Sequence, residues 1–77
     1  MALIEKFMPA PKDNNRVHEG VECGWTRFER KGRVYIQLDT YGSMSRKVPG
    51  KVSQSIQLDR DGAIELLRLL RQTFPGV

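Results

Sequence analysis

The chain has 77 residues, 39% hydrophobic and 29% charged, with a formal net charge of +4. This length predicts one domain with a thin hydrophobic core, because small domains bury a smaller fraction of their surface than large ones. A single cysteine and a single histidine exclude a disulfide within the chain and the usual zinc-ligand spacings, so we predict no metal and no cofactor. Self-association is then the expected route to stability, and we predict a homodimer.

The N-terminal segment lacks the apolar length of a signal peptide or a membrane span, because Glu5 and Lys6 interrupt it early. With one lone thiol there is no sign of an oxidising compartment, so we expect a cytoplasmic protein without membrane contact. Residues 9–20 are polar and rich in turn formers, which predicts that residues 1–20 form a partly flexible arm. Within it, ALIEKFM could pack as a short strand or as a helical turn, against the body or a partner subunit.

The folded domain is expected over residues 21–77 and begins with a strand, VECGWTRFER. Gly24 beside Trp25 indicates a bulge or a close backbone approach in this strand, which leaves the face of Trp25 open. Lys31-Gly32 then predicts a two-residue hairpin turn. In the next strand, RVYIQLDTY, the even-numbered residues 34–40 are expected to face inward and the odd-numbered residues 33–41 outward.

A basic connection, GSMSRKVPGK, separates this strand from VSQSIQL, which alternates again. The two IQLD copies, at 36–39 and 56–59, are best explained by strand periodicity. Asp59 is a candidate N-cap for a helix AIELLRLLRQTF that stops at Pro75-Gly76. Its broad apolar stripe suits a helix that touches both its own sheet and a second subunit.

These elements predict an α+β fold in which a three- or four-stranded antiparallel sheet carries one C-terminal helix packed on one face. The other face would stay wet, with Tyr35 and Tyr41 among glutamines and serines. Rings on an open sheet can stack on bases and cations can follow phosphates, so this pattern predicts single-stranded nucleic acid as partner. The expected cationic rim is Arg27 or Arg30, Arg33, Arg46, Lys47 and Lys51.

Other interpretations of the same residues remain open. Tyrosines on a strand are also favoured by β-propensity and by cross-strand pairing, and cations in a loop also serve solubility. Trp25 would fit the core as well as a binding platform. Asp39 in the middle of the wet face argues against phosphate contact there, and it could instead orient Arg33 or Arg46. The alternative function is a small regulatory subunit that binds an acidic protein through the same face.

The order of three strands followed by a C-terminal helix resembles one known family. The resemblance also rests on Gly24-Trp25 at the head of the first strand, on Lys51 before the last strand and on Ile56–Asp59 at the end of that strand. These are the bacterial relatives of the positive cofactor four family, which are single-stranded-DNA-binding transcriptional coactivators. The resemblance covers residues 24–74 and implies a dimer whose paired helices back a curved sheet. It also implies binding roles for Trp25, Arg27, Arg33, Tyr35 and Lys51. The chain departs from the family in its long 42–50 connection and in the polar Gln54. The string QLDTYGS with PGKVSQSIQLD also resembles a group of small uncharacterised bacterial proteins.

Catalytic patterns are weak in this chain. His18 and Cys23 lie five residues apart without an evident third group, which fits a surface histidine and a structural cysteine. The acids are too scattered to hold a catalytic metal, and VPGK lacks the rest of a phosphate-binding loop. We therefore predict a binding protein rather than an enzyme, with no catalytic residues and no small-molecule substrate.

Overall fold

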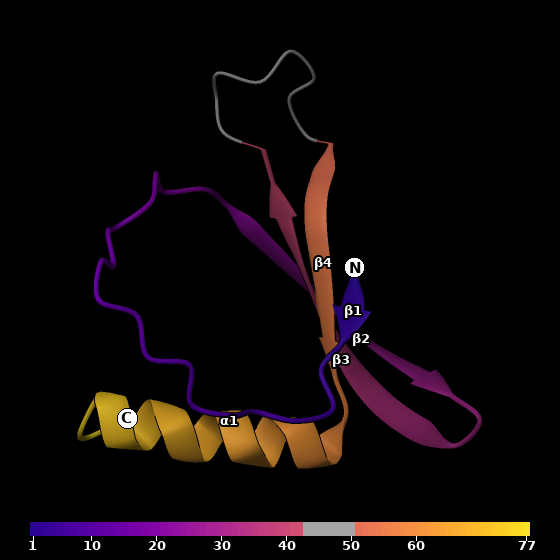
Figure 1. Ribbon diagram of the computed structural model, residues 1–77. Coiled ribbons are helices and arrows are strands. Elements are labelled where there is room, and N and C mark those ends of the chain that lie inside the picture. The colour runs from indigo at the N-terminus through magenta and orange to yellow at the C-terminus, as the bar shows by residue number, and fades with distance from the viewer. Residues whose placement is uncertain (43–50) are drawn as a thin grey trace.

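A computed structural model describes residues 1–42 and 51–77 of the chain. In this part of the chain a four-stranded sheet of order β1-β4-β3-β2 is followed by one helix, which confirms the predicted α+β class (Figure 1). The elements are β1 Ala2–Leu3, β2 Cys23–Arg30, β3 Arg33–Tyr41, β4 Val52–Leu58 and α1 Arg60–Thr73.

The β2–β3 hairpin turns at Lys31-Gly32, as the sequence predicts. Both residues have positive φ, 51° at Lys31 and 77° at Gly32, which is the geometry that a two-residue hairpin with right-handed twist requires. Arg30 therefore pairs with Arg33, and each step away from the turn extends the antiparallel register up to Cys23 opposite Thr40. The turn fixes which side chains of the two strands share a face.

The sheet is mixed, not wholly antiparallel. β3 and β4 pair antiparallel as expected, but β1 pairs parallel to β4, with Ala2 beside Ile56 and Leu3 beside Gln57. The Ile4 amide extends this pairing by donating to the Gln57 carbonyl at 2.9 Å. The N-terminal stretch thus takes one of its two open alternatives, a short strand against the body, because the outer edge of β4 offers backbone groups that need partners.

The expected close approach at Gly24 involves Tyr41 of the neighbouring strand. A Cβ placed on Gly24 would lie 2.7 Å from the Tyr41 hydroxyl and 3.3 Å from its Cε2 atom, so the phenol ring occupies the space that a side chain would take. The irregularity that accompanies it falls on the other side of β3, where the register with β4 shifts between Thr40 and Tyr41. A glycine is therefore needed at position 24 because the Tyr41 ring packs over it. The register shift is a separate feature at the end of β3.

Helix α1 begins and ends where the sequence predicts. The Asp59 carboxylate accepts a hydrogen bond from the Gly62 amide at 2.9 Å, and the Asp59 carbonyl accepts from Ala63. The helix ends at Thr73, followed by Phe74 as C-cap and by Gly76 with a φ of 96°. On its exposed surface Arg68 bonds to Glu65, which lowers the pKa of that carboxyl; any stabilisation from this pair would be lost as the pH falls through that pKa.

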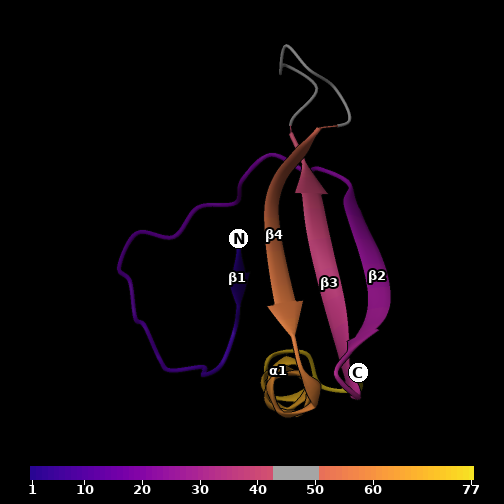
Figure 2. The same ribbon diagram turned by 90° about the vertical axis from the view of Figure 1, so that its right-hand side faces the viewer.

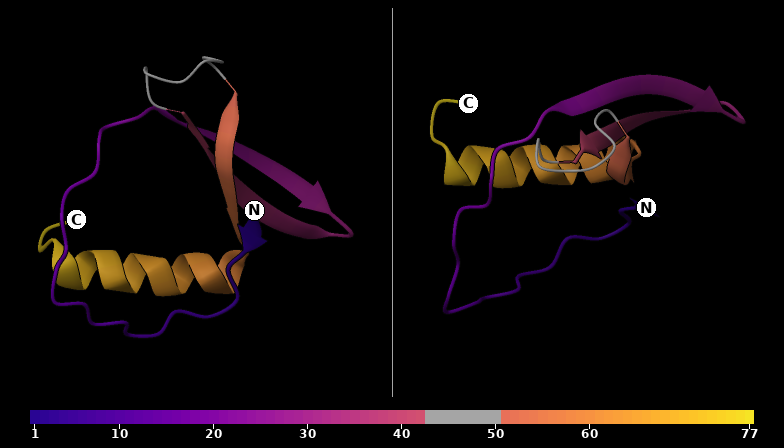
Figure 3. Two further views of the ribbon diagram at one scale, coloured as in Figure 1. Left: turned by 45° about the horizontal axis from the view of Figure 1, so that its top comes forward. Right: turned by 90° about the horizontal axis from the view of Figure 1, so that it is seen from above.

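The helix meets the sheet mainly through β4 and projects away from it on one side (Figures 1 and 2). Seen with the strands side by side, α1 is viewed nearly end-on below β4 (Figure 2). The segment between β1 and β2 forms a wide loop on the helix side of the sheet (Figure 3). The core is accordingly small: among the described residues, Leu58 is the one buried apolar side chain, and Ser55 of β4 is buried on the opposite face of the sheet.

The cap at Asp59 provides a stability test. Asp59→Ala removes the acceptor of the Gly62 amide and is expected to lower the free energy of unfolding by about 1 kcal/mol. Asp59→Asn keeps a side-chain oxygen at the cap and should stay within about 0.5 kcal/mol of the natural chain. Urea unfolding followed by circular dichroism measures both; equal losses in the two variants would contradict a capping role.

Candidate functional site

The two faces of the sheet differ in chemistry. Residues directly paired across β2, β3 and β4 point to the same side, so the register sorts the side chains. The apolar face, on the side of α1, carries Trp25, Arg27, Glu29, Val34, Ile36, Leu38, Ile56 and Leu58. The polar face, on the opposite side, carries Thr26, Phe28, Arg30, Arg33, Tyr35, Gln37, Asp39, Ser55 and Gln57. This confirms the predicted separation of even-numbered and odd-numbered residues in β3.

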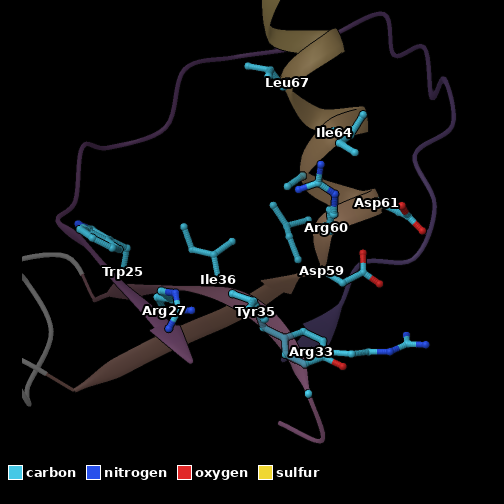
Figure 4. Close-up of a pocket in the computed structure, with 14 residues that line it drawn as sticks. Trp25, Arg27, Arg33, Tyr35, Ile36, Asp59, Arg60, Asp61, Ile64 and Leu67 are labelled. Carbon is cyan, nitrogen blue, oxygen red and sulfur yellow. The ribbon is translucent and has the colours of Figure 1, made fainter. Parts of the chain in front are cut away.

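The apolar face and the helix enclose an open hollow of about 920 Å³, which we call the apolar corner. Figure 4 shows Trp25 and Ile36 pointing from the sheet toward Ile64 and Leu67 of α1. Leu58 lies where sheet and helix join. Charged side chains of both signs, from Arg27, Arg33, Arg60, Asp59 and Asp61, surround this apolar lining, and Tyr35 also borders the hollow.

On the polar face, two arginines and then two aromatic rings follow the hairpin turn. Arg30 and Arg33 form the first cross-strand pair, and Phe28 and Tyr35 form a pair two residues further along each strand. The Phe28 and Tyr35 rings are stacked, with centroids 5.3 Å apart and planes 19° from parallel. Two cations thus lie next to two aromatic rings on the face that points away from α1.

A chain of side-chain hydrogen bonds continues the polar face across β3 and β4. The Gln57 amide donates to the Gln37 Oε1 atom at 2.8 Å, and the Gln37 amide donates in turn to Asp39 at 3.0 Å. The Ser55 hydroxyl donates to the same Asp39 carboxylate. All four side chains stand in register on neighbouring strands, so the carboxylate in the middle of the face is held by two neutral donors.

The structure does not bring all the predicted binding residues onto one face. Arg33, Tyr35 and Tyr41 lie on the polar face, Tyr41 through its ring over Gly24. Trp25 and Arg27 lie on the apolar face instead, with Trp25 71% exposed in the apolar corner. Strand alternation explains this, because Trp25 is opposite Leu38 and Arg27 opposite Ile36.

The alternative between Arg27 and Arg30 for the cationic rim is therefore decided in favour of Arg30. Arg27 forms an exposed ion pair with Glu29 at 2.9 Å on the other side of the sheet. Lys51 is exposed just before β4. Arg46 and Lys47, also predicted to contact nucleic acid, lie outside the described residues. Asp39 does not serve Arg33, one of the two roles considered for it, because its described partners are Gln37 and Ser55.

Sequence reasoning missed Phe28 as a member of the site. The signal was present, because a two-residue turn at Lys31-Gly32 places Phe28 opposite Tyr35 by counting outward from the turn. The hydrogen-bonded chain from Gln57 to Asp39 could not be counted in the same way. It depends on the register between β3 and β4, which are joined by a longer connection.

The described residues were also searched for a metal site and for a membrane-spanning helix. Within residues 1–42 and 51–77 no three acidic, histidine or cysteine side chains gather closely enough to hold a metal ion, and Cys23 is exposed. In the same part of the chain no helix has the length and apolar character that a membrane crossing requires.

Comparison of the chain with protein families, with curated proteins and with solved structures found no match in any of the three.

The Asp39 network can be tested by a double-mutant cycle. Asp39→Ala leaves the buried Ser55 hydroxyl and the Gln37 amide without their acceptor, and is expected to cost about 1–3 kcal/mol of unfolding free energy. Ser55→Ala should cost about 1 kcal/mol, and the double variant less than the sum of the two by at least about 0.5 kcal/mol. Strictly additive losses in urea unfolding would show that the two side chains are not coupled.

Proposed function

We propose that this protein binds single-stranded or locally unpaired nucleic acid on the polar face. The observation that supports this most directly is the stacked Phe28–Tyr35 pair beside Arg30 and Arg33, on the face that α1 leaves open. Both rings are half-buried, so they are held in place by the sheet while part of each ring remains available to a base. Base stacking on such rings contributes about 1–3 kcal/mol per base and needs no particular sequence.

The charges on the polar face determine where the backbone and the bases of a bound strand would lie. Arg30 and Arg33 lie at the hairpin end, whereas the Asp39 carboxylate lies two cross-strand pairs beyond the rings. The two arginines attract phosphates and the Asp39 carboxylate repels them, so the sugar-phosphate backbone should pass on the arginine side of the rings. The bases then extend toward Gln37 and Gln57, whose amides can donate to and accept from base edges.

A protein partner is the second candidate. The exposed Trp25 indole in the apolar corner favours it, because large aromatic side chains anchor protein interfaces. The two functions use opposite faces of the sheet, so they can be tested separately. We infer that either activity takes place in the cytoplasm, in keeping with the single free cysteine.

Salt dependence tests the role of the arginines. Binding of a fluorescein-labelled single-stranded oligonucleotide, followed by anisotropy at several salt concentrations, should weaken steeply as salt rises, since each neutralised phosphate contributes about 0.7 to the log–log slope. Changing both Arg30 and Arg33 to Gln should reduce the slope by about 1.4. Arg71→Gln, on the exposed last turn of α1, is the matched control and should leave it unchanged. No binding at low salt would refute the proposal.

Stacking is tested by changing one ring. Tyr35→Leu removes the aromatic face and should weaken oligonucleotide binding by roughly 5- to 150-fold, the equivalent of one stacked base. Tyr35→Phe keeps the ring that stacks on Phe28 and should bind nearly as well as the natural chain. If both variants bind alike while remaining folded by circular dichroism, the bases do not stack at this position.

A further inference from the structure

Gln57, at the end of the hydrogen-bonded chain on the polar face, keeps an unused donor and an unused acceptor. A glutamine amide has two N–H donors and one oxygen that accepts. Gln37 lies inside the chain, because its oxygen accepts from Gln57 and its nitrogen donates to Asp39. Gln57 donates one hydrogen to Gln37 at 2.8 Å, and among the described residues its second hydrogen and its Oε1 atom have no partner.

The free end of the Gln57 amide is accessible to a ligand. In the described part of the chain no buried side-chain nitrogen or oxygen lacks a hydrogen-bond partner, so the unpaired Gln57 oxygen must be open to solvent. The neighbour of Gln57 on the edge strand β1 is Leu3, which pairs with it in the parallel register. A leucine side chain has no polar atom that could occupy the free amide groups, so they remain available to a molecule on the polar face.

The network also fixes which way the Gln57 amide faces. Its Nε2 atom is held against the Gln37 oxygen, and the Gln37 amide is held in turn by the Asp39 carboxylate, which can only accept. Exchanging the nitrogen and the oxygen of Gln57 would place two oxygens against each other. A glutamine surrounded by solvent can rotate its amide to suit any base edge, whereas Gln57 presents its donor and its acceptor in a fixed order.

Gln57 also lies within reach of a base that stacks on Tyr35. Gln57 is directly opposite Gln37, and Tyr35 is two residues from Gln37 on the same strand and face. Diagonal neighbours of this kind are about 7–8 Å apart, a distance that aromatic and long side chains span. A base stacked on Tyr35 and projecting toward β4 therefore brings its edge to the Gln57 amide.

We propose that Gln57 recognises adenine, so that the protein prefers adenine-containing single strands; this inference rests on the nucleic-acid function proposed above. The free oxygen accepts from the adenine N6 amino group, and the free N–H donates to the adjacent ring nitrogen, N7 or N1, as glutamine does in bidentate contacts with adenine. Of the four bases, adenine alone places a donor beside an acceptor on both its Watson–Crick and its Hoogsteen edge. The Hoogsteen edge of guanine carries two acceptors, one of which would face the Gln57 oxygen.

The test compares three single strands of equal length and charge: oligothymidine, the same strand with adenine at every third position, and the same strand with unsubstituted purine there. Anisotropy titrations at one low salt concentration keep the phosphate contribution constant. The adenine strand should bind at least about 5-fold more tightly than oligothymidine, the lower bound for one bidentate base contact. Purine has the ring size of adenine without the N6 amino group, so the purine strand should lose most of this advantage.

Substitutions attribute the preference to Gln57. Gln57→Met keeps the length of the side chain and removes both hydrogen-bonding groups, so the advantage of the adenine strand should disappear. Gln54→Met makes the same change on the same strand, at an exposed position on the opposite face of the sheet, and should leave the preference unchanged. Gln57→Asn, which withdraws the amide by one carbon, is the second variant if Gln57→Met does not fold, and the same loss of preference is expected.

The outcomes separate this inference from the function on which it rests. Equal affinity for the three strands, with the steep salt dependence of phosphate contact, would overturn the role of Gln57 and leave the nucleic-acid site in place. An adenine preference that persists in Gln57→Met would also overturn it, because another residue would then recognise the base. No binding of any strand at low salt would refute both. The exchange of adenine for purine alters the ligand alone, so it is decisive whether or not a variant folds.

Discussion

The Lys31-Gly32 turn is the constraint on which the rest of the structure depends. Its two positive φ angles join β2 and β3 through a two-residue connection, which leaves one register for the hairpin. Side chains alternate with a period of two, so a slip by one residue would carry Tyr35 to the helix side and Ile36 to the open side. The stacked rings, the paired arginines and the apolar wall all follow from this turn.

The two unlike faces of the sheet are held in place by different interactions. The apolar face and α1 contain nearly all the surface whose burial can stabilise the chain, yet the helix is fixed to the sheet mainly at its first turn. Trp25, Ile64 and Leu67 in the apolar corner remain exposed, so this face stabilises the chain less than a closed core would. The polar face is also partly buried, since Ser55 is buried and Phe28 and Tyr35 are half-buried, and its side chains are held by hydrogen bonds and ring stacking.

Local patterns made most of the fold predictable. Alternation predicted both ends of β3 and of β4 correctly. The Asp59 cap and Pro75-Gly76 located α1, and the Lys31-Gly32 turn identified the hairpin. The parallel pairing of β1 was not predictable, because two residues carry no periodicity and their partner lies more than fifty positions away. The positions of Arg33, Tyr35, Gln37, Asp39 and Tyr41 on the polar face followed from alternation in β3. The face of Trp25 did not, since Gly24 interrupts the pattern of β2 just before it.

Asp39 gives the polar face a fixed hydrogen-bonding direction. Because the carboxylate can only accept, the Gln37 amide must present its NH₂ group to Asp39 and its oxygen to Gln57. Ser55 is oriented by the same carboxylate. Rotating the Gln37 amide would place its oxygen against the Asp39 carboxylate, and rotating the Gln57 amide would place two amide oxygens against each other. The pattern of donors and acceptors beside the aromatic pair is therefore set before any ligand arrives. A central acid that looks unfavourable for an anionic ligand thus has a structural reason to be there: it orders the amides that would contact the bases.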